Sequence, residues 1–212
     1  MNEQEILKLY ESMNAVWFFD YNGNPKAPHA ELTSGLCSDG YINSAPILAD
    51  PIMVEILAGE IIKRLPPDCC DWVVGSAYAA ITLSYEVARQ LNGVSHGFVE
   101  KDPENPKRMC WKRLVIPEGE IVLQCEELIT TLGTTMEVRR AINEENPEPV
   151  TFLPVVTTSI YRPSEKLQAS SIDVTALVTK IVQTWQPEKC PLCAAGSHRL
   201  RPKQNWVKLT VH

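Results

Sequence analysis

The amino-acid sequence predicts an α/β protein with a mainly parallel sheet flanked by helices and a small N-terminal unit. Short apolar runs typical of buried strands alternate with amphipathic helical patterns along the 212 residues, and this alternation is typical of parallel sheets. Hydrophobic residues make up 44% and charged residues 22% of the chain, which allows a substantial core. We expect three parts: an N-terminal unit of residues 1–48, a core of residues 49–186 and a tail of residues 187–212.

The N-terminal unit is expected to hold one helix and one hairpin. Apolar residues at helical spacing predict a helix over residues 2–13. Residues 29–43 are punctuated by glycines and predict a short hairpin. Asp50-Pro51 then combines a helix-capping residue with a proline at the first helical position, so the next helix should begin there.

The core is expected to alternate strands and helices. Residues 71–75 and 121–125 are short apolar runs that predict buried strands. Ligands of such sheets bind beyond the carboxyl ends of the strands, so we expect a site at the turns after Val74 and Cys125. The other expected elements are helices at 80–91, 134–145 and 177–185, strands at 95–100, 109–115 and 150–156, and an irregular tail from Pro187.

Composition argues against several classes of function. The formal net charge is −6, whereas tight non-specific binding to nucleic acid requires a clustered basic surface. No apolar run approaches the roughly 20 residues of a membrane-spanning helix. The seven cysteines are odd in number and scattered, which is typical of reduced thiols rather than of a disulfide framework. We therefore expect a cytoplasmic protein with a small-molecule substrate and with no nucleic-acid or membrane partner.

The segment 121–138 carries the most informative chemistry. Its strand ends in Glu126 and Glu127, and the run Thr-Thr-Leu-Gly-Thr-Thr at 130–135 leads into a helix. Backbone N–H groups and hydroxyls at a helix start can hold a phosphate, and paired carboxylates can accept hydrogen bonds from sugar hydroxyls. The pattern indicates a site for a sugar 5-phosphate. The alternative is a threonine-capped turn beside a solvated acidic pair.

This segment resembles the 5-phosphoribosyl pyrophosphate motif of type I phosphoribosyltransferases, in which two acids and two apolar residues precede Thr-Thr-Gly-Gly-Thr/Ser. Two positions depart from it: Glu127, where aspartate is usual, and Leu132, where glycine is usual. Glycine permits a positive φ, whereas leucine in the left-handed region would cost roughly 1–2 kcal/mol and would crowd the ligand. The resemblance implies that the carboxylates hold the ribose hydroxyls and that the 5-phosphate is held by Thr130, Thr131, Gly133 and Thr134.

Residues 32–43 resemble the N-terminal signature of orotate phosphoribosyltransferases, a segment that lies over the pyrimidine in that family. The resemblance implies that Ser34, Gly35 and Tyr41 border the base, and the alternative is a plain hairpin. Arg162 is the only arginine in the stretch 155–163, where the family usually carries an Asp-Arg pair with the arginine on the base.

Residues 71–93 resemble the strand, pyrophosphate loop and helix of the same family. Alanines stand at positions 79 and 80, where two loop glycines are usual, and each methyl removes freedom near the pyrophosphate. The resemblance implies that Gly75, Ser76 and Ala77 face the pyrophosphate. Lys101 lies in the segment 97–102, which resembles the strand before the mobile loop, and would add positive charge.

The tail contains one Cys-x-x-Cys pair, Cys190 and Cys193, similar to the Cys-Pro-x-Cys ending of one bacterial branch of these transferases. A structural zinc site usually needs four ligands. Cys69 and Cys70 lack the spacing of a second pair, and His198 supplies at best a third ligand. The sequence favours two ordinary thiols without metal and leaves metal binding by the pair open.

The resemblance spans residues 29–200 and implies transfer of phosphoribosyl from 5-phosphoribosyl pyrophosphate to a pyrimidine base, orotate first, with Lys101, Glu126 and Glu127 as catalytic residues. It implies Mg²⁺ bound mainly through substrate phosphates. It also implies a homodimer, because the mobile loop of family members commonly reaches the partner's site. One alternative is a catalytically weakened or inactive homologue that binds nucleotide or ribose phosphate, which Leu132, Ala79 and Ala80 favour; another is a transferase for a different base.

Overall fold

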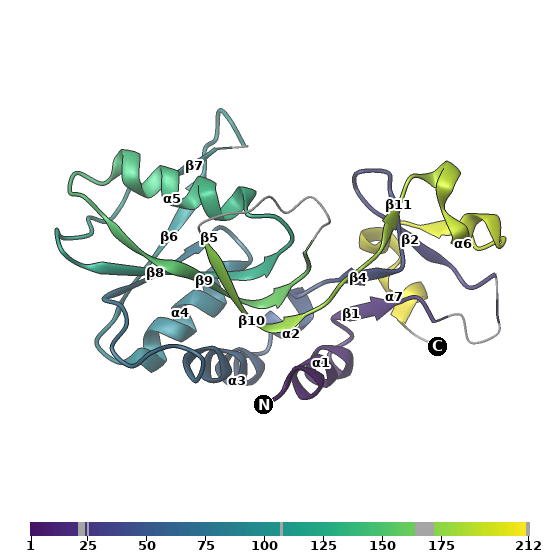
Figure 1. Cartoon of the computed structure of the whole chain (residues 1–212), viewed down its shortest axis with the longest axis horizontal. Helices are drawn as coiled ribbons and strands as arrows, with labels where there is room; N and C mark the ends of the chain where they lie inside the picture. Colours follow the sequence, from purple (N-terminus) through teal and green to yellow (C-terminus); the bar gives the residue numbers. More distant parts are fainter. Residues whose placement is uncertain (21–23, 25, 107, 164–171, 211–212) are drawn as a thin grey trace.

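The computed structural model describes the chain except residues 21–23, 25, 107, 164–171 and 211–212. Two lobes lie side by side along the long axis of the molecule (Figure 1). The core lobe is built on a six-stranded sheet, and the small lobe on a four-stranded sheet to which both ends of the chain contribute. No helix within the described part of the chain has the length and apolar character that crossing a membrane requires.

The core sheet has the strand order β10-β9-β8-β5-β6-β7, and all its neighbours are parallel except β6 and β7. The central strand β5 is buried along its whole length, as expected for a strand covered on both faces. The carboxyl ends of β5, β6 and β8 therefore meet at one edge of the sheet. The strands are β5 (Trp72–Ser76), β6 (Ser95–Lys101), β7 (Met109–Cys110), β8 (Ile121–Ile129), β9 (Thr151–Tyr161) and β10 (Asp173–Thr179).

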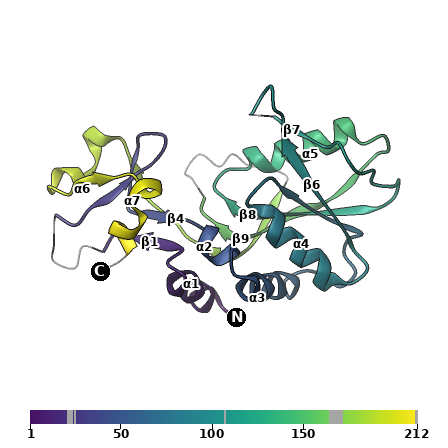
Figure 2. The ribbon, with the colours of Figure 1, turned by 180° about the vertical axis from the view of Figure 1, so that it is seen from behind.

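Helices cover both faces of this sheet. One apolar cluster joins α1, α3 and α4 to one face, and a second joins α5 to the other (Figures 1 and 2). The Asp50 carboxylate accepts hydrogen bonds from the backbone N–H groups of Ile52 and Met53 and so caps α3. The helices expected in this lobe are confirmed: α1 (Glu3–Ser12), α3 (Pro51–Ile62), α4 (Ala80–Leu91) and α5 (Gly133–Glu145); a short α2 (Ala45–Leu48) precedes α3.

The small lobe brings the N-terminal hairpin and the tail into one unit (Figure 2). Its four-stranded sheet has the order β11-β3-β2-β12, and a separate pair joins β1 to β4. Among the residues that the structure describes, the buried part of its apolar cluster consists of Trp17, Ala30 and Leu209. Its elements are β1 (Val16–Phe18), β2 (His29–Glu31), β3 (Cys37–Ser38), β4 (Gly40–Ile42), β11 (Thr184–Trp185), a 3₁₀ turn (Pro187–Lys189), α6 (Pro191–Ala194), β12 (Arg199–Leu200) and α7 (Pro202–Thr210).

Several predicted elements differ from the structure. The helix expected over 177–185 is wrong, because β10, which pairs with β9 in parallel, extends to Thr179 and β11 begins at Thr184. The pairing of β-branched residues along the sheet edge outweighs the helical spacing, and Ile181 of the expected apolar stripe is 68% exposed. The tail is regular rather than irregular, because its two short strands complete the small sheet. The expected strand 109–115 is reduced to Met109–Cys110.

Candidate active site

A pocket of about 340 Å³ lies at the carboxyl edge of the core sheet, where the sequence predicted a site. It is bounded by the ends of β5, β6 and β8, by the loop that leads from β5 into α4, and by the first residues of α5. The structure brings eight of the predicted site residues to its wall. These are Ser76, Ala77, Lys101, Glu126, Glu127, Thr130, Thr131 and Thr134.

The threonine-rich loop between β8 and α5 forms the end of the pocket that is suited to an anion such as phosphate. Thr130, Thr131 and Thr134 line it, while Gly133 is the first residue of α5 and lies next to the wall. The residue before the helix is Leu132, whose side chain cannot cap the first N–H groups. These N–H groups and the positive end of the helix dipole favour an anion.

Thr135 is a site residue that sequence reasoning missed. Its side chain lines the pocket, and its hydroxyl is buried without a hydrogen-bond partner in the described part of the chain. A buried polar group without a partner is costly, so the unpaired hydroxyl marks Thr135 as a candidate residue of the site. The sequence feature that could have indicated it is the second threonine of the pair 134–135. The family motif ends at the first threonine, so the second was assigned to the helix.

Leu132 does not have the strained conformation expected for it. Its φ is −82° and its ψ is 10°, so the backbone does not require glycine. Its side chain is 8% exposed and packs in an apolar cluster with Ile129 and Val156. The residue is absent from the wall of the pocket. Leucine at this position therefore neither strains the loop nor crowds the pocket.

Glu126 is held by a buried hydrogen-bond network. Its Oε2 accepts from the Ser76 hydroxyl at 2.6 Å, and its Oε1 accepts from Nε2 of Gln124 at 2.9 Å. Gln124 in turn accepts from the guanidinium of Arg139 at 3.2 Å. Burial raises the pKa of Glu126 to about 7, against the effect of its two donors. The carboxyl can therefore be charged or neutral near neutral pH, as its surroundings dictate.

Glu127 lies between two pockets. It lines the pocket described above and also a second one of about 400 Å³ beside α2 and the small lobe. Burial raises the pKa of its carboxyl. Its backbone carbonyl accepts from the Ser159 hydroxyl at 2.5 Å, which in turn accepts from the Tyr10 hydroxyl at 2.7 Å. These hydrogen bonds fix the backbone at the end of β8, and Glu127 lines both pockets.

The loop from β5 into α4 forms the opposite wall. Ser76, Ala77 and Ala79 line the pocket, and the N–H of Ala77 is already bonded to the carbonyl of Val99 at 2.9 Å. Gly75 lies outside the wall, where a Cβ would stand 2.4 Å from the Ser84 hydroxyl. Glycine is therefore required there by the packing of β5 against α4 rather than by a ligand. Ala79, at φ −66° and ψ −36°, has an ordinary helical backbone.

The predicted base-binding residues lie in the small lobe. Tyr41 lines the second pocket and also a third, of about 290 Å³, whose wall includes Gly35. Ser34 is exposed in the same hairpin turn, in which Gly35 has φ +82°. Arg162 follows β9, and its charge acts on the Tyr41 hydroxyl. Tyr41 and Glu127 thus connect the hairpin to the core pocket through the space between the lobes.

Curated relatives identify the family of this chain. The chain is 31% identical over 206 residues to the orotate phosphoribosyltransferase of Caldicellulosiruptor bescii, covering 95% of this chain and 97% of the relative. The chain belongs to the orotate phosphoribosyltransferase family. A second family member, the orotate phosphoribosyltransferase of Desulforamulus reducens, is 32% identical over 202 residues, with 95% and 97% coverage. No family model matches the sequence.

Solved structures support the fold of the family. The orotate phosphoribosyltransferase of Aeropyrum pernix matches with a TM-score of 0.57 at 16% identity, covering 82% of this chain and 93% of that one. The UMP synthase of Leishmania donovani matches with a TM-score of 0.59 at 19% identity, covering 82% of this chain and 36% of that one. At these identities the matches establish the type I phosphoribosyltransferase fold alone.

Proposed function

We propose that this chain transfers the phosphoribosyl group of 5-phosphoribosyl pyrophosphate to a ring nitrogen of orotate, giving orotidine 5′-phosphate and pyrophosphate in pyrimidine nucleotide biosynthesis. Family membership supports the reaction. The observation that carries it is the pocket itself, in which a threonine loop at a helix start faces two carboxylates and a lysine. These groups match the phosphate, the hydroxyls and the pyrophosphate of one substrate.

The proposed roles follow from the chemistry of each wall. Thr130, Thr131, Thr134 and the first N–H groups of α5 hold the 5-phosphate. Glu126 and Glu127 accept hydrogen bonds from the ribose hydroxyls. Burial raises the pKa of both carboxyls, so further hydrogen bonds from the sugar hydroxyls would favour their charged forms.

The pyrophosphate lies in this proposal against the start of α4, with Lys101 at the edge. The C–O bond to pyrophosphate breaks as the C–N bond to the base forms, so positive charge grows on the sugar and negative charge on the leaving group. Lys101, at the end of β6, offsets that negative charge. Holding both reactants in line supplies much of the remaining rate enhancement.

Mg²⁺ is the proposed cofactor, bound mainly through substrate phosphates. The carboxylates of Glu126 and Glu127 and the hydroxyl of Ser76 give the pocket the hard oxygen donors that this ion prefers. When bound, the ion would withdraw negative charge from the leaving pyrophosphate.

The base is proposed to occupy the space between the lobes. Tyr41 and Glu127 both line the second pocket there, next to the sugar site. Arg162 supplies a nearby cation, and orotate is an anion. This placement supports orotate over an uncharged base.

Consumption of orotate, followed by its absorbance in the presence of 5-phosphoribosyl pyrophosphate and Mg²⁺, tests the proposal. Turnover that is lost with Glu127→Gln supports it, whereas faster turnover with uracil or adenine would replace orotate by another base. No turnover, with calorimetric binding of 5-phosphoribosyl pyrophosphate intact, would favour the non-catalytic alternative. Leu132 no longer supports that alternative, because its side chain lies outside the pocket.

We further propose a homodimer in the cytoplasm. The family resemblance supports the dimer, and exposed apolar side chains on the core lobe, Tyr85, Leu114 and Val115, offer a surface for it. All seven cysteines are free of disulfides, as expected in a reducing compartment. Light scattering coupled to gel filtration would give twice the chain mass of 23.7 kDa if the dimer forms.

A further inference from the structure

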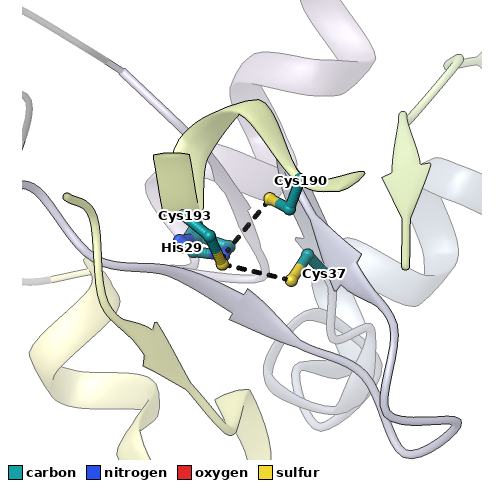
Figure 3. Close-up of side chains that lie close together, drawn as sticks. All are labelled: His29, Cys37, Cys190 and Cys193. Carbon is teal, nitrogen blue, oxygen red and sulfur yellow. Dashed lines mark hydrogen bonds between the residues drawn. The ribbon is translucent and has the colours of Figure 1, made fainter. Parts of the chain in front are cut away.

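Four metal-ligating side chains converge in the small lobe, outside the pocket described above (Figure 3). His29 comes from β2 and Cys37 from β3, whereas Cys190 directly precedes the short helix α6 and Cys193 lies within it. Their ligand atoms all lie within 4.8 Å of one another. His29 and Cys37 are fully buried, and Cys190 is 3% exposed.

Three distances between ligand atoms of this cluster match a tetrahedral zinc site. Zn–S bonds of about 2.3 Å and Zn–N bonds of about 2.0–2.1 Å place neighbouring sulfurs about 3.8 Å apart and sulfur and nitrogen about 3.6 Å apart. The Cys37 and Cys193 sulfurs are 3.7 Å apart. Nε2 of His29 lies 3.7 Å from the Cys190 sulfur and 3.5 Å from the Cys193 sulfur.

The histidine is also oriented as a ligand. The Ser197 hydroxyl donates its hydrogen to the carbonyl of Ala27 at 2.5 Å, so it accepts a hydrogen bond from Nδ1 of His29 at 2.7 Å. A proton on Nδ1 leaves the lone pair on Nε2, which faces the thiols. Metal-bound histidines commonly have such a second hydrogen bond, which fixes the tautomer and the ring.

We propose that His29, Cys37, Cys190 and Cys193 form a structural zinc site. One imidazole and three thiolates make a closed set of four protein ligands, a set that leaves no open position for substrate and is typical of structural zinc. The sequence suggested His198 as a third ligand, but that side chain is exposed and only its backbone carbonyl bonds to β2. The two ligands that complete the site lie more than 150 residues before the Cys-x-x-Cys pair.

The site would stabilise a lobe that has little apolar core of its own. Its strands have two or three residues, and Trp17, Ala30 and Leu209 form the buried part of its apolar cluster. Small units of this kind commonly depend on a metal or on disulfides. A zinc ion would clamp both ends of the hairpin 29–37 to the tail. If the proposed function holds, it would also fix the hairpin turn that carries Ser34 and Gly35 against the tail.

Metal analysis of the untagged chain, purified without chelator under reducing conditions, is the first test. We expect about one zinc per chain by mass spectrometry of the metal. The metal-free protein titrated with Co²⁺ should show visible d–d bands of tetrahedral coordination and a thiolate charge-transfer band. Removal of zinc should lower the melting temperature and increase amide exchange in β2, β3 and β12 more than in β5.

Variants distinguish zinc binding by these side chains from the simple packing of unligated cysteines. Cys193→Ser and His29→Ala should lose the zinc, whereas Cys69→Ser, a half-buried cysteine outside the cluster, should keep it. His29→Cys offers a fourth thiolate and should retain zinc with an altered cobalt spectrum, which distinguishes lost coordination from failed folding.

Other results would overturn the zinc assignment. These are a metal-free chain that gives no cobalt spectrum, a Cys193→Ser variant with full zinc content, or stoichiometric iron in place of zinc. Because metal content is read without activity, zinc without orotate turnover would refute the proposed function and leave the site intact.

Discussion

The core lobe and the small lobe are held together in different ways. Strands of the core sheet reach eleven residues, and extended apolar clusters cover both of its faces. Strands of the small lobe have two or three residues around a minor apolar cluster, next to the His29 and cysteine cluster. Burial of apolar surface is sufficient for the first lobe, whereas the second needs specific polar or metal-mediated links.

The two lobes also place their functional residues differently. In the core lobe, Glu126 to Thr135 form one continuous segment, so a single strand-turn-helix positions half of the pocket. In the small lobe, residues 29–41 meet residues 190–206 across most of the chain. Chemistry should therefore depend mainly on the core lobe, and the two lobes should differ in stability.

The largest effect is expected for Lys101→Met. Loss of one preorganised cation beside the leaving group should lower kcat/KM for 5-phosphoribosyl pyrophosphate about 10²–10³-fold. Lys101 is exposed at the end of β6, so the melting temperature should stay unchanged. Steady-state kinetics with Lys8→Met, an exposed lysine on α1, as control would check this. Equal activity of both variants would remove Lys101 from the site.

Leu132→Gly is expected to act on stability instead of activity. Removing a leucine that is 8% exposed from the cluster with Ile129 and Val156 should lower the free energy of unfolding by about 3 kcal/mol. Activity per folded molecule should not rise, because Leu132 lies outside the pocket. Urea denaturation alongside Ile181→Gly, at a 68% exposed isoleucine, gives the comparison. A clear gain in kcat would show that the leucine does restrict the loop.

The sequence was informative wherever function depends on neighbours along the chain. The acids at 126 and 127 and the threonines after them predicted the pocket because one strand and one helix carry them all. The same reasoning misjudged Leu132, because the motif assumes a positive φ that this backbone does not adopt. It also predicted a helix over 177–185, because apolar spacing along the chain does not show that β10 can pair with the edge of β9.

The small lobe was largely beyond sequence reasoning. Cys37 and His29 follow no metal-binding spacing with Cys190 and Cys193, and only folding brings them within bonding range. The same holds for Tyr41 and Trp206, whose rings pack at 5.7 Å although they lie far apart in sequence. Contacts of this kind depend on tertiary packing, which local patterns do not encode.

A smaller effect, on pH dependence, is expected for Glu126→Gln. Burial raises the pKa of this carboxyl from 4.5 to about 7, so the folded protein binds the proton more tightly than the unfolded chain does. The free energy of unfolding should therefore fall as the pH rises from 4.5 to about 7, by about 2 kcal/mol from this group. The uncharged glutamine should remove that decline. Urea unfolding across this range would test it, with the exposed Glu148→Gln as control, and parallel profiles for wild type and E126Q would contradict it.

The smallest expected effect, from two tryptophan-to-phenylalanine changes, tests most directly whether the lobes unfold independently. Trp206 donates its indole N–H to the carbonyl of Asn14 at 2.7 Å, and Trp72 donates its own to Glu120 in the core lobe. Each tryptophan-to-phenylalanine change keeps most of the ring and removes one hydrogen bond, which is worth about 1 kcal/mol. Amide exchange should increase in β1 and β4 for Trp206→Phe, and in β5 and β8 for Trp72→Phe. If amide exchange rises in both lobes for either variant, the lobes unfold as one unit. The two lobes would then differ in how they are built but would not be independently stable.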